Sequence, residues 1–259
     1  MIFVNNFDPV LLEFGSLQVR WYGLCFVVGL SLGYLVIRWA FKKEGLKMED
    51  LESVAFYLFV GLIVGARLGH VLFYDFNYFW RHPLEILMIW NGGLASHGAA
   101  IGLLIAYLLW LKIHKKKFVQ YIDALVLGFP LVAGFVRIGN FFNSEIVGYK
   151  TGGDYGVVFA RLGEDFARHP AQLYESLLSF TIFAVMIFVY VNYRDRLKPL
   201  FFVFLYMGLY FGGRFFLEYT KDLHVFSSDF PLSMGQVLSI LPVLLTVGYA
   251  IYYPKISKR

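Results

Sequence analysis

The sequence predicts an all-α integral membrane protein, folded as a bundle of seven transmembrane helices. Hydrophobic residues make up 59% of the 259 residues and only 16% are charged, giving a mean hydropathy of +0.63, which lies outside the usual range of soluble domains. The apolar residues gather in runs of about 20, the length of a helix that crosses a bilayer. The runs are continuous and do not alternate with period two, which argues against a transmembrane β-barrel.

Seven apolar segments are long enough to span, and backbone groups in lipid must be satisfied within the segment, so each is expected to be a helix. In chain order they cover roughly residues 19–41, 51–74, 96–113, 121–142, 172–191, 199–217 and 234–253. Glycines recur four residues apart on four of them, which favours close helix packing over ligand binding: Gly29 and Gly33; Gly61, Gly65 and Gly69; Gly98 and Gly102; Gly208 and Gly212. Cys25, the single cysteine, is expected to be a buried apolar thiol.

No composition shift divides the chain, so residues 1–259 are expected to form one transmembrane domain. Segment 76–90 is too short and too polar to span, but it is amphipathic and aromatic, as interfacial segments are. Segment 149–171 holds four glycines and Pro170 and is expected to form a small exterior cap. Residues 1–13 lack a basic region and contain two carboxylates, so they are not expected to be a cleavable signal peptide.

The basic residues predict the orientation. Fourteen lysines and arginines lie in or next to the loops of one side and six in those of the other, so the positive-inside rule puts the fourteen in the cytoplasm. The N-terminus is then outside and the C-terminus is cytoplasmic. The net charge of +5 does not indicate nucleic-acid binding, because the basic residues form short clusters between apolar runs.

Arg137 stands near the end of the fourth apolar segment. An arginine at the centre of a spanning helix costs about 2.5–3.5 kcal/mol, so it marks a functional site unless its stem snorkels to the interface. Asn140 and Asn143 follow it at helical spacing, with Glu145 just beyond, and Gly139 removes bulk beside them. This spacing predicts a polar pocket that opens in the outer half of the membrane.

Four further polar residues are expected at the same depth, at the outer ends of other helices: Tyr22, His97, Arg214 and Glu218. Arg137 and Arg214 could clamp a phosphate, because guanidinium presents a rigid fork of donors. Glu218 follows Arg214 by four residues, so it could orient or neutralise that arginine, or the pair could be structural glue.

His97 opens the third apolar segment after a glycine-containing stretch. A histidine there can act as a general base near neutral pH, and it could equally hold a head group or the 92–98 turn. The other histidines show no metal-ligand spacing, and no nucleotide-binding or acyl-serine motif is present. Nucleotide use and acyl-serine chemistry therefore lack support.

The stretch from Gly134 to Gly148, G-x-x-R-x-G-N-F-x-N-x-E-x-x-G, resembles the signature of the prolipoprotein diacylglyceryl transferases. Further segments along nearly the whole chain resemble the same family: Arg20 to Gly23, Gly65 to Gly69, Gly92 to Gly98, Arg168 to Glu175, Gly213 to Glu218 and Ser233 to Gln236. One departure is Ala99, where many relatives carry a second glycine after the histidine, and it affects only the local turn.

The resemblance implies a multi-pass enzyme of the bacterial cytoplasmic (inner) membrane whose active site faces the outer leaflet. It would move the diacylglyceryl group of phosphatidylglycerol to the lipobox cysteine of a prolipoprotein signal peptide, forming a thioether and releasing glycerol phosphate. The resemblance implies neither a cofactor nor a metal. The matching positions imply catalytic roles for Tyr22, His97, Arg137, Arg214 and Glu218, and substrate-binding roles for Gly98, Arg137, Asn140, Asn143, Glu145 and Arg214.

Two other interpretations stay open from the residues. A flippase for an anionic lipid would also use intramembrane arginines, but it would need polar positions along the whole crossing. A purely structural protein would not need such a crowded polar cluster. If the transferase interpretation is right, the site should open sideways to lipid between helices, because both substrates are too apolar to arrive through water.

Overall fold

The computed structural model describes residues 1–259 except 16, 90–91, 223–231 and 257–259. The described chain forms two compact units, which we describe one at a time. The first comprises Met1–Ile37 and Ile122–Arg259, and the second comprises Arg38–Tyr121.

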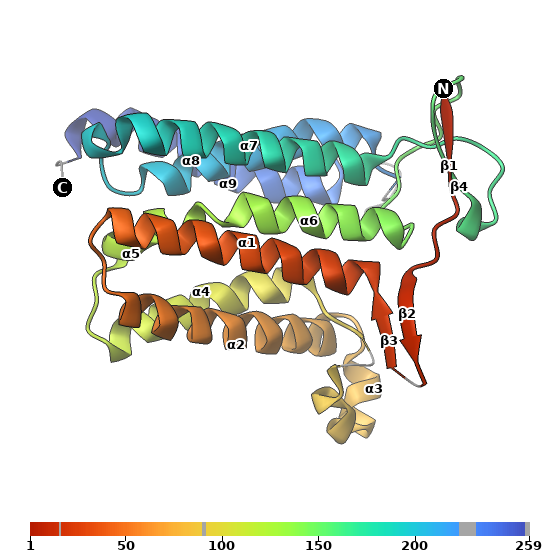
Figure 1. Ribbon diagram of the computed structural model, residues 1–259, viewed down its shortest axis with the longest axis horizontal. Coiled ribbons are helices and arrows are strands. Elements are labelled where there is room, and N and C mark those ends of the chain that lie inside the picture. Colours follow the sequence, from red (N-terminus) through yellow and green to blue (C-terminus); the bar gives the residue numbers. More distant parts are fainter. Residues whose placement is uncertain (16, 90–91, 223–231, 257–259) are drawn as a thin grey trace. The chain divides into compact units, whose positions relative to one another are not determined.

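The first unit is built around four helices that run side by side (Figure 1). They are α6 (Phe129–Phe142), α7 (Ala171–Tyr193), α8 (Phe201–Leu217) and α9 (Met234–Tyr252). Helix α1 (Trp21–Lys43) belongs to this unit as far as Ile37 and packs on α6. A Cβ at Gly33 would lie 3.1 Å from the carbonyl oxygen of Gly128, so the glycines set how closely these two helices approach.

Among the described residues, six helices are long and apolar enough to span a membrane, and the count is seven if the bent pair α5 (Phe118–Val126) and α6 is one span. The sequence predicted one continuous helix over 121–142. That prediction was wrong, because α5 and α6 meet at a 41° bend. Pro130 explains the break, since its ring has no N–H to donate and clashes with the preceding turn, and Gly128, two residues earlier, gives little resistance.

Side chains satisfy backbone N–H groups at the starts of α8 and α9. Ser233 and Gln236 form a reciprocal capping box at the start of α9, with N···O distances of 2.9 and 3.2 Å. The carboxylate of Asp123 accepts hydrogen bonds from the backbone N–H groups of Leu200 and Phe202, at 2.9 and 3.1 Å, at the start of α8. Buried Asp123 therefore satisfies donors that α8 cannot satisfy itself.

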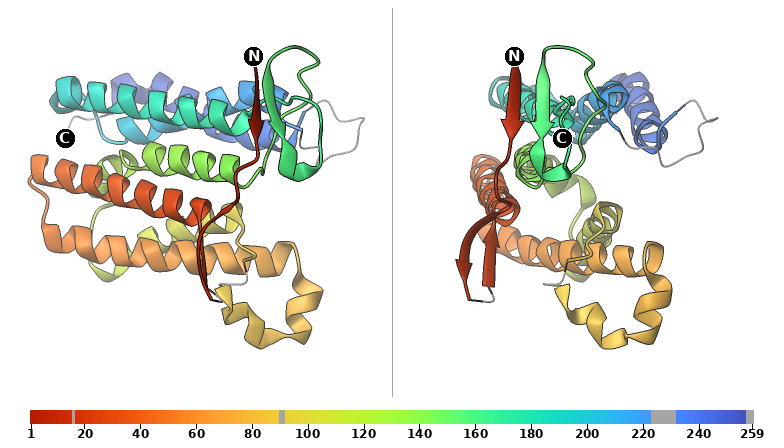
Figure 2. Two further views of the ribbon diagram at one scale, coloured as in Figure 1. Left: turned by 45° about the vertical axis from the view of Figure 1, so that its right-hand side comes forward. Right: turned by 90° about the vertical axis from the view of Figure 1, so that its right-hand side faces the viewer.

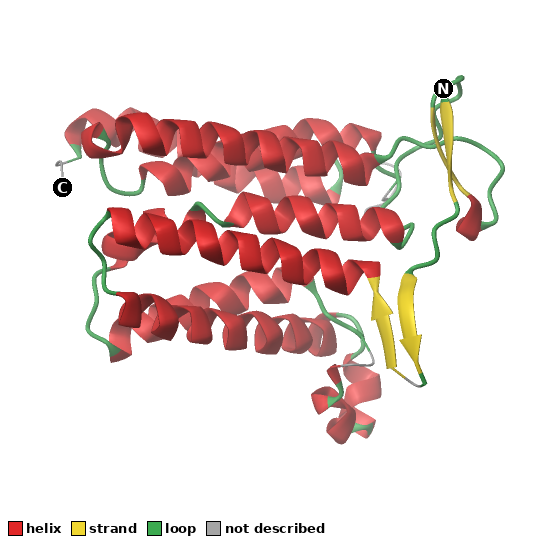
Figure 3. Ribbon diagram, in the orientation of Figure 1, coloured by secondary structure: helices red, strands yellow, loops and turns green. Residues whose placement is uncertain are grey.

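Two small sheets accompany the helices of the first unit, and the all-α prediction did not include them (Figure 3). Strands β2 (Val10–Phe14) and β3 (Leu17–Arg20) form an antiparallel hairpin that leads into α1. Strand β1 (Ile2–Asn5) pairs in parallel with β4 (Gly156–Phe159), and both views in Figure 2 show the two alongside each other. The predicted cap over 149–171 thus contains a strand whose partner comes from the start of the chain.

The second unit consists mainly of α2 (Met48–Phe73) and α4 (Ser96–Ile113), packed glycine against glycine. A Cβ on Gly65 or on Gly102 would collide with the backbone of the facing helix, which confirms the packing role that the glycine spacing predicted. The predicted interfacial segment 76–90 contains two short helical pieces, α3 (Phe76–Arg81) and the 3-10 helix Pro83–Leu87. Its placement at the membrane surface stays a prediction.

Candidate functional site

The polar cluster of the first unit is centred on Arg137, near the C-terminal end of α6. Its Nε lies 2.7 Å from Oε2 of Glu175 on α7, and its Nη1 donates to Oδ1 of Asn140 at 3.2 Å. The side chain of Arg137 is 15% exposed. The spacing argument therefore correctly put Arg137 and Asn140 on one face, while Glu175 was not among the predicted site residues.

The turn after α6 extends this network to Glu145. Asn140 donates to Oε2 of Glu145 at 3.1 Å and Asn143 donates to Oε1 at 3.2 Å. The residues on either side of Glu145, Ser144 and Ile146, both have φ of 55°, a conformation that is uncommon for any residue except glycine and an outlier for a β-branched one. Such strain is held only where the surroundings determine it, and here it holds the carboxylate toward the two amides.

A second part of the cluster is formed by Glu175, Glu218 and Lys221. The ammonium of Lys221 lies 2.6 Å from Oε1 of Glu175 and 3.0 Å from Oε2 of Glu218. The three side chains are between 2% and 5% exposed. Glu175 thus contacts a different cation with each of its oxygens, and it joins α6 and α7 to the segment after α8.

The sequence suggested that Glu218 would face Arg214, one helical turn earlier. The structure pairs Glu218 with Lys221, three residues later, because α8 ends at Leu217 and the chain continues as the 3-10 turn Glu218–Thr220. In a 3-10 turn, side chains three residues apart are the ones that align. The suggested pairing of Glu218 with Arg214 was therefore wrong.

Arg214 itself has no ion pair within 4.0 Å among the described residues. Its Nε is buried and finds no hydrogen-bond acceptor in that same part of the chain. Arg137 and Lys221, by contrast, both lie against carboxylates. Among the described residues, Arg214 is therefore the arginine of this cluster that has no carboxylate at ion-pair distance, although its charge still acts on Glu175.

Two glycines make room for functional side chains. A Cβ on Gly139 would lie 2.9 Å from the ring of Tyr22, so Tyr22 at the start of α1 packs directly on the backbone of α6 beside Asn140. A Cβ on Gly235, at the start of α9, would overlap the carboxylate of Glu218. The glycine in the predicted Ser233 to Gln236 motif thus leaves the space that this carboxylate occupies.

Arg168 ties the cap to the segment that carries Glu218 and Lys221. It pairs with Glu164 and with Asp222, each at 2.6 Å, and donates to the carbonyl oxygen of Gly148 at 3.0 Å. Hydrogen bonds that the Arg168 guanidinium donates to these two carboxylates, Glu164 first, raise its pKa above the ordinary value. This small polar core fixes the position of the 218–222 segment.

His97 and Gly98 lie in the second unit. His97 is exposed in the first turn of α4, and Gly98 packs against the backbone of Gly65 and Gly69 on α2. Whether His97 joins Arg137 stays a prediction.

The loop before His97 is held by Arg67, which the sequence did not single out as a site residue. Arg67 is 5% exposed, and its guanidinium donates to backbone carbonyl oxygens of five loop residues: Glu85, Ile86, Met88, Gly92 and Gly93, at distances from 2.5 to 3.5 Å.

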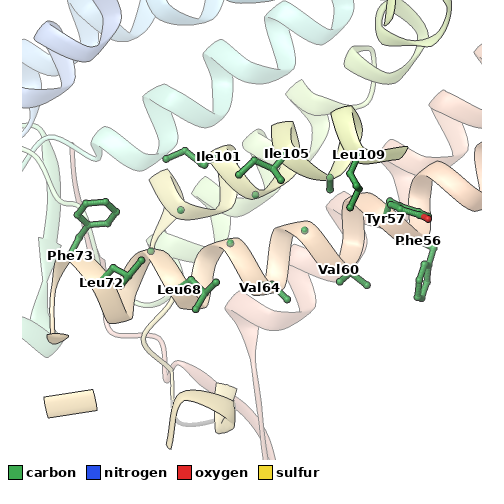
Figure 4. Close-up of a pocket in the computed structure, with 16 residues that line it drawn as sticks. Phe56, Tyr57, Val60, Val64, Leu68, Leu72, Phe73, Ile101, Ile105 and Leu109 are labelled. Carbon is green, nitrogen blue, oxygen red and sulfur yellow. The ribbon is translucent and has the colours of Figure 1, made fainter. Parts of the chain in front are cut away.

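An apolar groove of about 530 Å³ runs along α2 and α4 (Figure 4). Large side chains such as Leu68 and Ile105 flank it, and the packed glycines line it. Its lining includes Gly98 but neither His97 nor a charged residue, so the groove lacks the groups that could perform chemistry. Within the described ranges, no three His, Cys, Asp or Glu side chains lie close enough to hold a metal ion.

The fold and this cluster define a multi-pass membrane protein with several buried charged side chains near the ends of its helices. The family model for prolipoprotein diacylglyceryl transferase matches residues 9–252. The chain therefore belongs to the prolipoprotein diacylglyceryl transferase family.

Three relatives named phosphatidylglycerol–prolipoprotein diacylglyceryl transferase illustrate the similarity. The protein of Tolumonas auensis is 40% identical over 92% of this chain and 93% of its own length. That of Bacteroides fragilis is 36% identical, over 96% and 95%. The protein of Porphyromonas gingivalis is 39% identical, over 92% and 90%. The similarity thus covers nearly the whole of each chain.

Sequence reasoning passed over Glu175 and Lys221, which the structure places in the cluster, and Arg67, which holds backbone groups within the second unit. Glu175 carried a usable signal, since a carboxylate in the first turns of an apolar span needs a partner as much as an arginine does. Lys221 carried none, because it stood among the exterior loop cations used to predict orientation.

Proposed function

We propose that this protein transfers the diacylglyceryl group of phosphatidylglycerol to the lipobox cysteine in the signal peptide of a prolipoprotein, the first step of lipoprotein maturation. The observation that carries the proposal is the similarity to the transferase family over residues 9–252. The paired and unpaired guanidinium groups of Arg137 and Arg214 supply the chemistry that a phosphodiester substrate requires.

The reaction forms one bond and breaks one. The cysteine thiolate attacks the glyceryl carbon, and the carbon–oxygen bond to phosphate breaks with its electron pair passing to oxygen. The products are a thioether and glycerol phosphate, and the thiol proton passes through a base to the phosphate product. Negative charge grows on the leaving phosphate, where guanidinium groups fixed in a water-poor site stabilise it most.

Each predicted site residue has a role in this scheme. Arg137 and Arg214 bind the phosphate, and His97 is the leading candidate for the base, since a thiol of pKa about 8.5 is mostly protonated at neutral pH. Asn140, Asn143, Glu145 and Gly98 line the head-group site, and Tyr22 and Glu218 complete it. No cofactor or metal takes part.

The location follows from both substrates being amphiphiles. We place the protein in the bacterial cytoplasmic membrane, as a single transmembrane catalytic domain with the N-terminus outside, the C-terminus cytoplasmic and the active site at the outer leaflet. Seven spans give this topology, with α5 and α6 counted as one bent span. Substrates enter sideways from lipid, and confinement of both to one leaflet supplies part of the proximity that catalysis needs.

The test is to incubate the purified protein in lipid nanodiscs with phosphatidylglycerol and a lipobox peptide. Mass spectrometry should show a peptide that carries a diacylglyceryl thioether. A peptide with serine in place of the lipobox cysteine is the matched control and should stay unmodified. Movement of the lipid between leaflets of a vesicle without thioether formation would contradict the proposal and favour a flippase.

A further inference from the structure

The charged cluster is not a uniform patch of positive charge. Arg137 lies 2.7 Å from one oxygen of Glu175, and Lys221 lies 2.6 Å from the other. Lys221 also meets Glu218 at 3.0 Å, so two cations and two carboxylates balance within this group. The group draws on α6, α7 and the segment after α8.

Such a group of buried, balanced charges adds little to the stability of the fold. The side chains of Glu175 and Lys221 are 4% and 2% exposed, so both charges have lost most of their water. For buried ion pairs, the desolvation cost is as large as the attraction or larger, and what they supply is geometry. Here the fixed geometry is that of the Arg137 guanidinium, held through Nε by Glu175 and through Nη1 by Asn140.

Arg214 is the counterpart. It meets no carboxylate within 4.0 Å in the described part of the chain, and its Nε is buried there without an acceptor. A buried donor left unsatisfied is costly, so this guanidinium gains from any anion that enters. Arg137 is thus held in an ion pair, whereas the described residues leave Arg214 with an unsatisfied Nε and no carboxylate at ion-pair distance.

We propose that Glu175 is a positioning residue that gives the two arginines, Arg137 and Arg214, different roles. By holding Arg137 on one oxygen and Lys221 on the other, it fixes the guanidinium that meets the leaving phosphate and cancels excess charge. Arg214 is then left to attract the anionic head group. This inference rests on the proposed function and adds a residue to its machinery.

Steady-state kinetics of Glu175→Gln in nanodiscs test the proposal, with phosphatidylglycerol varied. We expect kcat to fall about 100-fold because Arg137 loses its anchor, while KM for the lipid does not rise, because removal of a carboxylate makes the site more positive. Glu175→Asp, which keeps the charge, should lose less activity. This split between kcat and KM is not expected from a residue that only stabilises the fold.

The double variant Glu175→Gln/Lys221→Met separates positioning from folding. It removes the unbalanced ammonium along with the carboxylate, so Tm should recover toward the parent value, while kcat should stay low because Arg137 still lacks its ion pair with residue 175. Recovery of kcat together with Tm would overturn the proposal and make Glu175 structural. So would a Glu175→Gln enzyme with a kcat within about threefold of the parent.

Two further measurements complete the design. Asp123→Asn removes a buried carboxylate that caps α8, and it should lower Tm without splitting kcat from KM. Retention of phosphatidylglycerol, measured by native mass spectrometry, needs no turnover. If the parent forms no thioether, the proposed function is wrong. If Glu175→Gln retains less phosphatidylglycerol than the parent does, the positioning role of Glu175 is wrong, whatever the outcome for the proposed function.

Discussion

Arg67 and Arg137 are both arginines within apolar helices, and the structure uses them in different ways. The Arg67 guanidinium donates to the backbone carbonyl oxygens of five residues of the second unit. None of these carbonyl groups can change its charge or leave the site. Arg137 meets ionisable and amide side chains from its own helix and from α7. A buried arginine is therefore not a substrate site in itself, and its partners decide what it can do.

The largest effect is expected from Arg67→Met. It removes the donor from the carbonyl oxygens of five half-buried or exposed residues at once, so we expect these residues of the second unit to lose their fixed positions and Tm to fall sharply. Thermal unfolding in detergent measures this. Unchanged Tm with lost activity would show that Arg67 belongs to the catalytic machinery and would end the contrast with Arg137.

Arg137→Lys should show the opposite pattern. The ammonium keeps the charge but cannot meet Glu175 and Asn140 in a fixed fork, so we expect a loss of activity of about 100-fold to 1,000-fold with little change in Tm. Turnover of the lipobox peptide and thermal unfolding should be compared in the same preparation. Near-normal turnover would mean that charge alone matters at this position.

His97→Gln tests whether the second unit contributes a base. We expect the activity to fall about 100-fold, since general-base catalysis contributes at least that much, and the rate to rise with pH more steeply than for the parent. The readout is the pH–rate profile between pH 6 and about 9, where thiols of pKa about 8.5 ionise. Substantial activity with a profile parallel to that of the parent would assign His97 to the head group or to its turn.

The smallest effects concern the glycines. A methyl group at Gly65 would collide with the backbone at Gly98 and Gly102, so Gly65→Ala should destabilise by about 1–3 kcal/mol. Gly212 on α8 is the matched control, because a Cβ there meets nothing within 4 Å. Gly212→Ala should leave Tm unchanged or raise it by stiffening the helix. Equal Tm changes in the two variants would mean that glycine packing does not hold α2 to α4.

Hydropathy alone determined the membrane helices of this protein. The helices α1, α2, α4, α7, α8 and α9 begin and end within about three residues of the segments read from the sequence, because the bilayer sets both the length and the apolar character of a span. Glycine spacing likewise determined the packed faces of α2 and α4, since four-residue spacing is a local property of a helix.

The sequence also determined which residues of α6 share a face, but tertiary structure decided the ionic partners. The carboxylate that meets Arg137 comes from Glu175, 38 positions away, and the 3-10 turn after Leu217 directs Glu218 to Lys221 instead of Arg214. Strand β1 pairs with β4, which lies about 150 residues further along the chain. Such pairings depend on where separate helices end in space, and periodicity along one segment carries no information about that.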